Sequence, residues 1–444
     1  MRLLILGLSL SIAIPLAARD TVAEPDSVEL FNGKDLSGWI NVNCAPGVWT
    51  VRDGSIVCSG TQRGFIRTER MYQNYVLEFD WRHATRGGNA GVFAHADALP
   101  QVGAPFPRAI EVQVRDGSGG DVASLFGIRG AELLPLTNPQ RGSLEGHLLA
   151  RPTEERIKPT GEWNHYRLTS MDGALDLEIN GKVVTRAWRC TQWKGYVGLE
   201  SEKGECHFRN LRLTPLPGPE LPPGRIARAD EGFAPLFDGG TLDGWRVAEG
   251  MKGHWAAAGG AIDYDGKAEG KEKDLWTARE YGDFVLVADW RFPSPLASKP
   301  HPIVLPSGDF DLDETGRRKE YPHPDAGDSG IFLRGSRKAQ INIWCQELGS
   351  GEIRDYRLDK SLPPGVRAAC LPVAKADLPP GEWNRFEITA KGDRVTVVLN
   401  GVTVIADARL PGLPVKGPIG LQHHGDPVQF MNLYIRELKD ESDK

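Results

Sequence analysis

The chain lacks the short motifs that mark several large enzyme classes. No GxSxG, HExxH, P-loop or glycine-rich dinucleotide motif occurs in its 444 residues. Serine hydrolases, zincins, ATPases and dehydrogenases are therefore unsupported. An excess of basic residues is also missing, because 59 Asp and Glu outnumber 53 Lys and Arg and give a formal net charge of -6. We expect no nucleic-acid partner.

Cysteine is scarce, with 6 residues in the whole chain. None stands in a CxxC or Cys/His spacing, so a zinc site has no support and we expect no cofactor. Four cysteines lie in the first half and two in the second: Cys44, Cys58, Cys190 and Cys206, then Cys345 and Cys370. In an exported protein these residues could form disulfides, with pairing inside each half as the simplest arrangement and the connectivity left open.

Long apolar runs are absent after the first residues. Residues 1–23 have the form of a signal peptide, with Arg2 as the positive start, an apolar stretch from Leu3 to Leu16, and small residues up to Ala23 for cleavage. Pro15 interrupts the stretch early, and an uncleaved anchor is the weaker alternative. We expect a periplasmic or secreted protein with no membrane span in its mature chain.

Helical periodicity is absent as well, while 52 glycines and 32 prolines favour short strands joined by turns. The sequence also repeats itself. Five blocks return in the same order, among them ELFNGKDLSGW as PLFDGGTLDGW, NYVLEFDWR as DFVLVADWR, and NAGVFAHA as DSGIFLRG. Five blocks in one order indicate two homologous domains. The boundaries predicted are 26–216 and 233–438, joined by a proline-rich linker over 217–232.

Each copy has the pattern of an all-β domain. The segments LEINGKVV and VVLNGVTV place Asn180-Gly181 and Asn400-Gly401 between alternating stretches. Asn-Gly is the strongest short-range hairpin signal, because both central residues of such a turn need positive φ. Domains of this length built from short strands fit a jelly-roll β-sandwich better than an immunoglobulin domain. The fold class predicted is all-β, with two tandem jelly-roll sandwiches.

One strand in each copy has an unusual polar face. In the second copy Ile341, Ile343 and Cys345 alternate with amides and an indole, namely Gln340, Asn342, Trp344 and Gln346. In the first copy, Ala109–Asp116 alternates buried aliphatic residues with Glu111, Gln113 and Arg115. Amides and an aromatic plane can hold a polyhydroxylated ligand, so we expect a saccharide there. An amide ladder along a strand edge is the alternative.

Neighbouring segments add further candidates for ligand binding: Arg82 and Asn89 in the first copy, Asp328 and Arg334 in the second. We expect these to share a polar sheet face with the two strands above. The alternative is a lattice of salt bridges, which would include the pairs Asp80–Arg82 and Asp289–Arg291. Two residues in loops of the second copy, Glu352 and His424, could serve as general base or acid.

The second copy also carries a long insertion between Arg291 and Asp328. Alternating Asp309, Asp311 and Asp313 within it could offer oxygen ligands to calcium, but no closing Glu follows. A solvated acidic loop is the favoured interpretation. Such a loop next to the polar strand could also cover one end of a binding cleft.

The repeated blocks LFxGxxLxGW, DWR, GEWN and NG, together with EVQVRD, resemble the 3-keto-disaccharide hydrolase domain family in both copies. The resemblance implies a concanavalin-like jelly roll acting on sugars. The first copy departs from the family with Asn89-Ala-Gly and Glu200-Ser-Glu202, where Asn-Ser-Gly and Gln-x-His are favoured. The second keeps the Gln-x-His loop as Gln422–His424 but has QINIWCQ, residues 340–346, where Glu-x-Gln is favoured.

The chemistry implied by the resemblance is a β-elimination. A ketone at C3 acidifies the C2 hydrogen, so a base can remove it and expel the C1 substituent, after which water adds. In the first copy the candidates are Glu111 as base with Gln113, Arg115 and Asn89 as donors. In the second copy the base would be His424 or Glu352, with Arg334, Gln340, Asn342 and Gln346 as donors. The alternatives are a tandem saccharide-binding protein without turnover and an interaction module. The sequence leaves the oligomeric state open.

Overall fold

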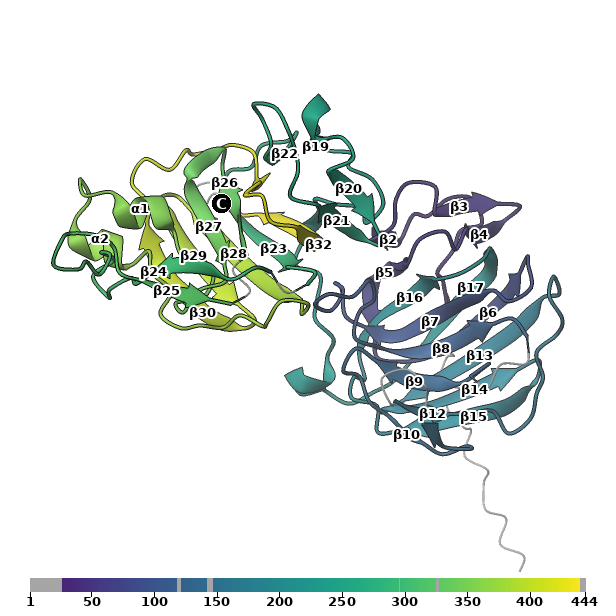
Figure 1. Ribbon diagram of the computed structural model, residues 1–444. Coiled ribbons are helices and arrows are strands. Elements are labelled where there is room, and N and C mark those ends of the chain that lie inside the picture. Colours follow the sequence, from purple (N-terminus) through teal and green to yellow (C-terminus); the bar gives the residue numbers. More distant parts are fainter. Residues whose placement is uncertain (1–25, 118–120, 142–146, 295, 325–326, 440–444) are drawn as a thin grey trace, which may run out of the picture.

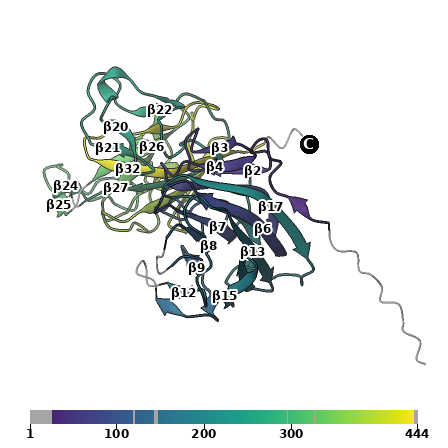
Figure 2. The same ribbon diagram turned by 90° about the vertical axis from the view of Figure 1, so that its right-hand side faces the viewer.

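The computed structural model describes residues 26–117, 121–141, 147–294, 296–324 and 327–439. The signal peptide expected at residues 1–23 lies outside this part of the chain. Two β-sandwiches stand side by side, the first made by strands up to β17 and the second by strands from β18 onward (Figure 1). Seen from the side, the two sheets of the first sandwich lie face to face (Figure 2). The predicted all-β fold of two tandem jelly-roll domains is confirmed.

Each sheet of the first domain runs antiparallel. The back sheet has the order β10, β15, β14, β13, β6, β17, β4, β3, with β1 beside β17: Leu134–Pro135, Lys182–Trp188, Ala174–Ile179, Asn164–Met171, Asn74–His83, Cys206–Leu216, Ser55–Cys58, Trp49–Arg52 and Val28–Glu29. The front sheet has the order β11, β12, β9, β8, β7, β16, β5, β2: Gln140–Arg141, Leu148–Ala150, Leu125–Ile128, Ala109–Arg115, Asn89–Ala96, Gly195–Ser201, Gly64–Tyr72 and Trp39–Val42.

The second domain repeats this plan with a smaller front sheet. Its back sheet has the order β20, β21, β32, β23, β28, β29, β30, with β18 beside β32: Trp255–Ala258, Ala261–Tyr264, Val428–Glu437, Phe284–Arg291, Asn384–Lys391, Arg394–Leu399, Val402–Arg409 and Ala234–Pro235. Its front sheet has the order β19, β22, β31, β26, β27: Trp245–Arg246, Leu275–Thr277, Gly420–Leu421, Asp328–Leu333 and Ser336–Trp344.

The remaining elements lie outside these sheets. The hairpin of β24 (Lys299–Pro302) and β25 (Glu320–His323) forms part of the insertion. The only α-helices in the described residues are α1 (Arg354–Leu358) and α2 (Pro364–Ala368), and 3-10 turns occur at Pro223–Arg225 and Glu249–Met251. None of the described helices has the length and apolar character needed to cross a membrane.

The predicted Asn-Gly hairpins are confirmed. β14 and β15 meet at Asn180 and Gly181, with φ of 46° and 87°, and β29 and β30 meet at Asn400 and Gly401, with φ of 50° and 82°. Two positive φ values in succession match the right-handed twist of the flanking strands. The strand alternation is also as predicted, because Ile110, Val112 and Val114 in β8 and Ile341 and Ile343 in β27 are fully buried in the two cores.

The possible disulfides of the first half do not form, because Cys44, Cys58, Cys190 and Cys206 carry reduced thiols, and Cys370 of the second half does as well. Five of the six are buried. Cys58 and Cys206 are direct cross-strand partners in β4 and β17. Burial raises the pKa of Cys58 to about 11 and that of Cys44 to about 12, which keeps both protonated and unreactive. Each domain relies on its hydrophobic core, and the thiols belong to that core.

The two domains meet through the front sheet of the first and the back sheet of the second. An apolar cluster joins Phe65, Phe93 and Phe106 of the first domain to Val287 and Tyr434 of the second. Phe93 lies directly opposite Glu111 in the strand register, so the two side chains point to the same face of the front sheet. This is the outer face of the first sandwich. The second domain therefore covers part of the face on which Glu111 is displayed.

A buried polar network accompanies this cluster. Asp289 accepts hydrogen bonds from Arg385 at 2.6 and 2.9 Å, from Asn432 at 2.7 Å and from the backbone N–H of Gly103 at 2.9 Å. Asn432 accepts from Asn43 of the first domain at 2.8 Å. Satisfied buried polar groups fix one geometry, because any displacement would leave a charge unpaired.

Candidate active site

A pocket of about 510 Å³ opens on the outer face of the first domain's front sheet. Strands β7, β8 and β16 supply its polar floor, because alternate residues of each strand point to this face. Glu111 and Gln113 come from β8, Asn89 from β7 and Glu200 from β16, and Glu202 follows at the end of β16. Phe106, Phe126 and Leu149 give the pocket apolar surface on which the C–H face of a sugar ring could rest.

Glu111 and Glu200 approach each other across a glycine. A Cβ built on Gly91 would lie 2.8 Å from Oε2 of Glu200 and 3.0 Å from Oε1 of Glu111. Any side chain at position 91 would thus meet both carboxyl groups. The absence of a side chain here lets the two acids converge above β7.

This convergence changes the ionisation of both acids. Burial, followed by the charges of Glu202 and Asp121, raises the pKa of Glu111 to about 8. Burial and the neighbouring Glu111 carboxyl raise the pKa of Glu200 well above its usual value. Two like charges in one desolvated site cannot both form at neutral pH, so the pair retains a proton. Paired groups of this kind can divide into an acid and a base.

Glu202, the third acid of the pocket, has cationic and amide partners. Nη2 of Arg63 lies 2.9 Å from Oε1 of Glu202, and Asn89 donates its amide N–H to Oε2. Three buried oxygens of this pocket find no hydrogen-bond partner among the described residues, namely Oδ1 of Asn89, Oε1 of Gln113 and Oε2 of Glu200. Such acceptors favour a ligand with hydroxyl donors, because a buried unpaired oxygen is costly.

Arg115, also predicted from the sequence, lies at the rim of the pocket. Its Nη1 donates to both carboxylate oxygens of Asp121 at 2.8 Å. The sequence had also suggested that Arg82 shares this face, and the structure corrects this expectation. Arg82 is the last residue but one of β6, in the back sheet, and stacks on Trp163 at 4.7 Å. The chain crosses from one sheet to the other between β6 and β7, so polar residues of successive strands reach opposite sides of the sandwich.

The salt-bridge lattice exists on the back sheets, with partners other than those predicted. Asp80 bonds to His165 at 2.8 Å and Asn210 at 2.7 Å, and not to Arg82. Asp289 bonds to Arg385, and not to Arg291. The neighbouring strand offers a closer partner than the residue two places along the same strand.

The front sheet of the second domain carries amides where the first has acids. Register places Gln340 opposite Phe332, as Glu111 lies opposite Phe93, and Gln422 follows Leu421 as Glu200 follows Leu199. Gln340 donates its amide N–H to Gln422 Oε1 at 2.6 Å and to Asn342 Oδ1 at 2.8 Å. The amides are thus partly satisfied by one another.

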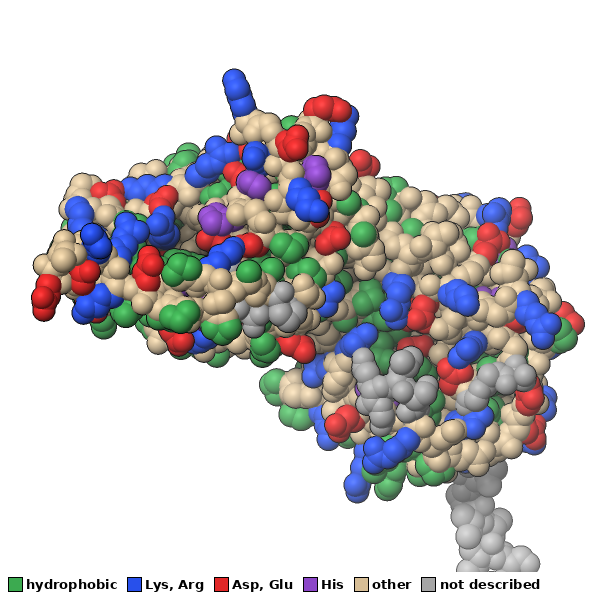
Figure 3. All heavy atoms as spheres, in the orientation of Figure 1, with side chains coloured by type: hydrophobic (Ala, Val, Ile, Leu, Met, Phe, Trp, Pro, Cys, Tyr) green, Lys and Arg blue, Asp and Glu red, His purple; other side chains and the backbone are tan. Residues whose placement is uncertain are grey.

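A second group of titratable residues lies at the edge of this sheet, where histidine side chains stand among charged ones over β26 and β27 (Figure 3). Nε2 of His424 is 3.4 Å from Oδ2 of Asp328. Asp426 accepts from the backbone N–H of Asp328 at 3.1 Å and from Lys299 at 2.8 Å. Burial and the charge of Asp426 raise the pKa of Asp328 to about 7, and burial lowers the pKa of His424. The structure thus brings Asp328 and His424 together.

Other candidates of the second domain are engaged elsewhere. Glu352 and Arg357 form an ion pair in which both side chains are 0% exposed, and Gln346 donates to Glu352 at 3.2 Å. Arg334 is buried and donates to four backbone carbonyls and to Asp283. Trp344 packs against His301 of the β24–β25 hairpin, with ring centroids 4.8 Å apart. The insertion therefore covers the indole that the sequence had offered to a ligand.

The acidic residues of the insertion lie among cations and turn N–H groups. Asp309 pairs with Lys360 and with Arg367 at 2.5 Å, Asp311 pairs with Lys319 at 3.1 Å, and Asp313 accepts from the backbone of Thr315 at 2.8 Å. Within the described residues, no group of three or more His, Cys, Asp or Glu side chains is arranged to hold a metal ion. This arrangement fits the acidic loop, and the calcium alternative stays a prediction.

Sequence reasoning missed Glu200 and Arg63 as members of the pocket. Glu200 was noted only as a departure from a family pattern, although its place in an alternating stretch puts it on the face of Asn89. Arg63 precedes β5, and nothing local in the sequence relates it to β8. The pairing of β5 with β16 and of β16 with β7 brings these residues together.

Comparison with known proteins places the chain in a family. The family described as the 3-keto-alpha-glucoside-1,2-lyase-like domain matches residues 26–214 and again residues 232–436. The chain belongs to this family. It is 23% identical over 239 residues to a 3-keto-disaccharide hydrolase of Bacteroides thetaiotaomicron, a match that covers 42% of this chain and 77% of the relative.

Two solved structures that match the chain each cover less than half of it. One is a Parabacteroides distasonis protein provisionally described as a glycosyl hydrolase, with 22% identity, a TM-score of 0.33, and coverage of 43% of this chain and 94% of the other. Another is the carbohydrate-binding module CBM66 of Bacillus subtilis, with 13% identity, a TM-score of 0.30, and coverage of 39% and 94%.

Proposed function

We propose that this family member is an exported enzyme that cleaves the glycosidic bond of 3-keto-glycosides, with its catalytic centre in the first domain. The observation that carries the proposal is the convergence of Glu111 and Glu200 above Gly91, with a raised pKa on each. Elimination beside a ketone needs one base and one acid at a single site, and a proton-sharing carboxyl pair supplies both.

Glu111 is the base in this proposal. With its pKa at about 8, it ionises within reach of neutral pH, whereas Glu200, with its pKa held well above the usual value, keeps its proton. Glu111 removes the C2 hydrogen as a proton, and the C–H electrons form the C1=C2 bond. The C1–O bond breaks, and Glu200 protonates the departing oxygen. Water then adds across the double bond, so the net change is hydrolysis.

The developing enolate needs hydrogen-bond donors or a positive charge. The amide of Gln113 and the guanidinium of Arg63 line the pocket with the acids. Arg63 is held by Glu202, which keeps the cation beside the pair. The apolar faces of Phe106 and Phe126 exclude water from one side of the ring, which strengthens every charge interaction in the site.

The test uses p-nitrophenyl 3-keto-glucosides of both anomers, with the unoxidised glucosides as controls. Release of nitrophenol from the oxidised substrate alone supports the proposal. In D2O, deuterium incorporated at C2 of the product distinguishes elimination and hydration from direct displacement at C1. A purified, folded protein that releases nothing, with or without added divalent metal, would overturn it.

The alternative, a tandem saccharide-binding protein without turnover, has one observation in its favour. Gln340 and Gln422 stand where the first domain has its acids, and an amide cannot act as general base. The second domain suits a binding role for this reason. Saccharide binding without release of nitrophenol would favour this alternative for the whole chain.

A further inference from the structure

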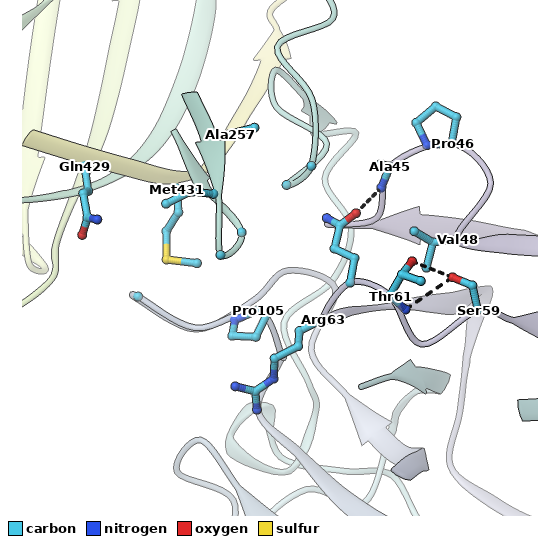
Figure 4. A pocket seen from close by; sticks show the side chains of 18 of the residues that line it. Ala45, Pro46, Val48, Ser59, Thr61, Arg63, Pro105, Ala257, Gln429 and Met431 are labelled. Carbon is cyan, nitrogen blue, oxygen red and sulfur yellow. Dashed lines mark hydrogen bonds between the residues drawn. The ribbon is translucent and has the colours of Figure 1, made fainter. Parts of the chain in front are cut away.

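A second, larger cavity of about 1060 Å³ lies between the two domains. Figure 4 shows its walls facing each other, with Gln429, Met431 and Ala257 of the second domain on one side and Ala45, Pro46, Val48, Ser59 and Thr61 of the first on the other. We call this cavity the interdomain cleft. It exists only because the two sandwiches are docked, since neither domain supplies both walls.

The cleft adjoins the carboxylate pocket. Arg63 and Arg129 line both spaces, so these two side chains stand where one space meets the other. Arg63 also stacks on Phe106 at 5.1 Å from its ring centroid, and Phe106 belongs to the apolar cluster that joins the domains. The docking of the second domain thus determines the shape of both spaces.

The chemistry of the cleft suits a neutral, polyhydroxylated chain. No Asp or Glu occurs among the described residues that line it. Arg291 stacks on the half-buried ring of Trp383 at 4.5 Å and donates to the side chain of Gln429 at 2.7 Å and to the backbone carbonyl of Gly381 at 3.3 Å. The guanidinium–indole pair on the wall of Gln429 offers stacking for sugar rings, and the hydroxyls of Ser59 and Thr61 on the opposite wall offer hydrogen bonds for sugar hydroxyl groups (Figure 4).

The first domain has an equivalent arginine–tryptophan pair that does not line a cavity between the domains. Arg82 stacks on Trp163 at 4.7 Å from the ring centroid, and Arg209 also stacks on this ring, at 3.8 Å. Trp163 lines neither the interdomain cleft nor the carboxylate pocket. Trp383, in contrast, lies over Gly103 of the first domain, where an added Cβ would come within 2.2 Å of the indole.

We propose that the interdomain cleft binds the distal units of an oligosaccharide whose reacting unit occupies the carboxylate pocket. The second domain then supplies a subsite that makes affinity depend on the length of the oligosaccharide, and it takes no part in catalysis. The proposal takes its ligand class from the proposed function. It assigns a role to a domain whose own front sheet has amides at the places of Glu111 and Glu200.

The test measures binding of unoxidised glucose oligosaccharides, which carry no ketone and are not expected to turn over. Calorimetric titration of the full chain with two-unit and five-unit probes of α-1,4, α-1,6, β-1,3 and β-1,4 linkage gives the dependence of affinity on length. For at least one linkage we expect the longer probe to bind about tenfold tighter, the gain of one stacked ring. Equal affinity for short and long probes in every linkage would overturn the proposal.

Variants separate the cleft from the pocket. Ala258→Trp adds bulk at an exposed cleft position without removing an interdomain contact, and it should abolish the length-dependent gain while leaving two-unit binding unchanged. Trp383→Ala should also reduce the gain, whereas Trp163→Ala is the matched control and should retain it. A length-dependent gain that survives Ala258→Trp contradicts the proposal. Because no turnover is measured, these results stand apart from the nitrophenol assay, whose failure would refute only the catalytic function.

Discussion

Glu111 of the first domain and Gln340 of the second occupy the same position in two homologous sheets. Each lies directly opposite a phenylalanine on the neighbouring strand, Phe93 for Glu111 and Phe332 for Gln340. Beyond that strand, Glu200 and Gln422 repeat the same contrast. The two copies thus share the same arrangement of strands, but only the first has a pair of carboxyl groups that can act as acid and base. This difference underlies the predictions below.

Glu111→Gln gives the first domain the glutamine that the second domain has at the equivalent position, Gln340. The side chain keeps its size and shape but can no longer act as a base. We therefore expect turnover of a 3-keto-glucoside to fall by about 10²–10⁴-fold, with little change in thermal stability at pH 5. Steady-state kinetics on the purified variant measures this.

Asp328→Asn is the matched control, because Asp328 is the acid of the second domain whose pKa is raised to about 7. It should leave turnover within about twofold of the parent, a difference of only a few tenths of a kcal/mol. Loss of activity in Asp328→Asn with full activity in Glu111→Gln would move the catalytic centre to the second domain.

The ionisation of Glu111 should make the fold less stable at alkaline pH. Its folded-state pKa of about 8 lies above the ordinary value of 4.5. The stability conferred by burying the neutral carboxyl is therefore fully present below pH 4.5 and is lost as pH rises through about 8. Thermal unfolding between pH 5 and pH 9 should show a Tm that falls with pH, and a smaller fall for Glu111→Gln. Parallel curves for parent and variant would contradict the buried, proton-bearing state.

The same ionisation should produce the catalytic base. If Glu111 acts as a carboxylate, kcat/KM rises with pH until the group with a pKa of about 8 is ionised. Measurement of kcat/KM from pH 5.5 to 9 on the oxidised nitrophenyl substrate tests this. A profile that is flat below pH 8 would rule out a base of this pKa.

Gly91→Ala should separate the two acids. The new methyl group would lie 2.8 Å from Glu200 Oε2 and 3.0 Å from both Cγ and Oε1 of Glu111, so both acidic side chains have to move. We expect a loss of kcat of at least about tenfold with a stability change below about 1 kcal/mol. Gly224→Ala, where an added Cβ meets nothing within 4 Å, is the control for the substitution itself. Unchanged kcat in Gly91→Ala would argue against a catalytic pair above this residue.

Glu352→Gln tests a different role for a buried acid. Both members of the Glu352–Arg357 pair are fully buried, so removing one charge leaves the other uncompensated. We expect a loss of about 3–5 kcal/mol in the free energy of unfolding of the second domain, measured in urea. A variant that kept its stability and lost turnover would instead identify Glu352 as the base that the sequence had suggested.

Much of the fold could be predicted because its signals are local or repeated. The alternation of apolar and polar residues predicted which faces of β8 and β27 are buried. The Asn-Gly pairs predicted two hairpins, because few other structures have positive φ at two successive residues. The repeat gave two domains without any knowledge of their contacts. The two α-helices were not predicted, because five-residue segments such as Arg354–Leu358 carry too little periodicity.

The candidate site was predicted less completely. Glu111, Gln113 and Asn89 were found because they stand on adjoining strands with clear alternation, and the structure brings them into one pocket. Arg82 was placed on the wrong sheet, because alternation fixes which side of a strand a residue occupies but not the sheet to which that strand belongs. Glu352 was a candidate base in a predicted loop, whereas the structure buries it in an ion pair with Arg357.

The sequence by itself determined that the chain has two jelly-roll domains, that both resemble one family, and that one strand in each has a polar face. These features depend on residues near one another in the chain or on a comparison of its two halves. The tertiary structure alone decided that Glu200 meets Glu111 and that the second domain docks on the face displaying them. Both relationships join residues far apart in the chain, whose proximity depends on strand order and on the packing of one whole sheet against another.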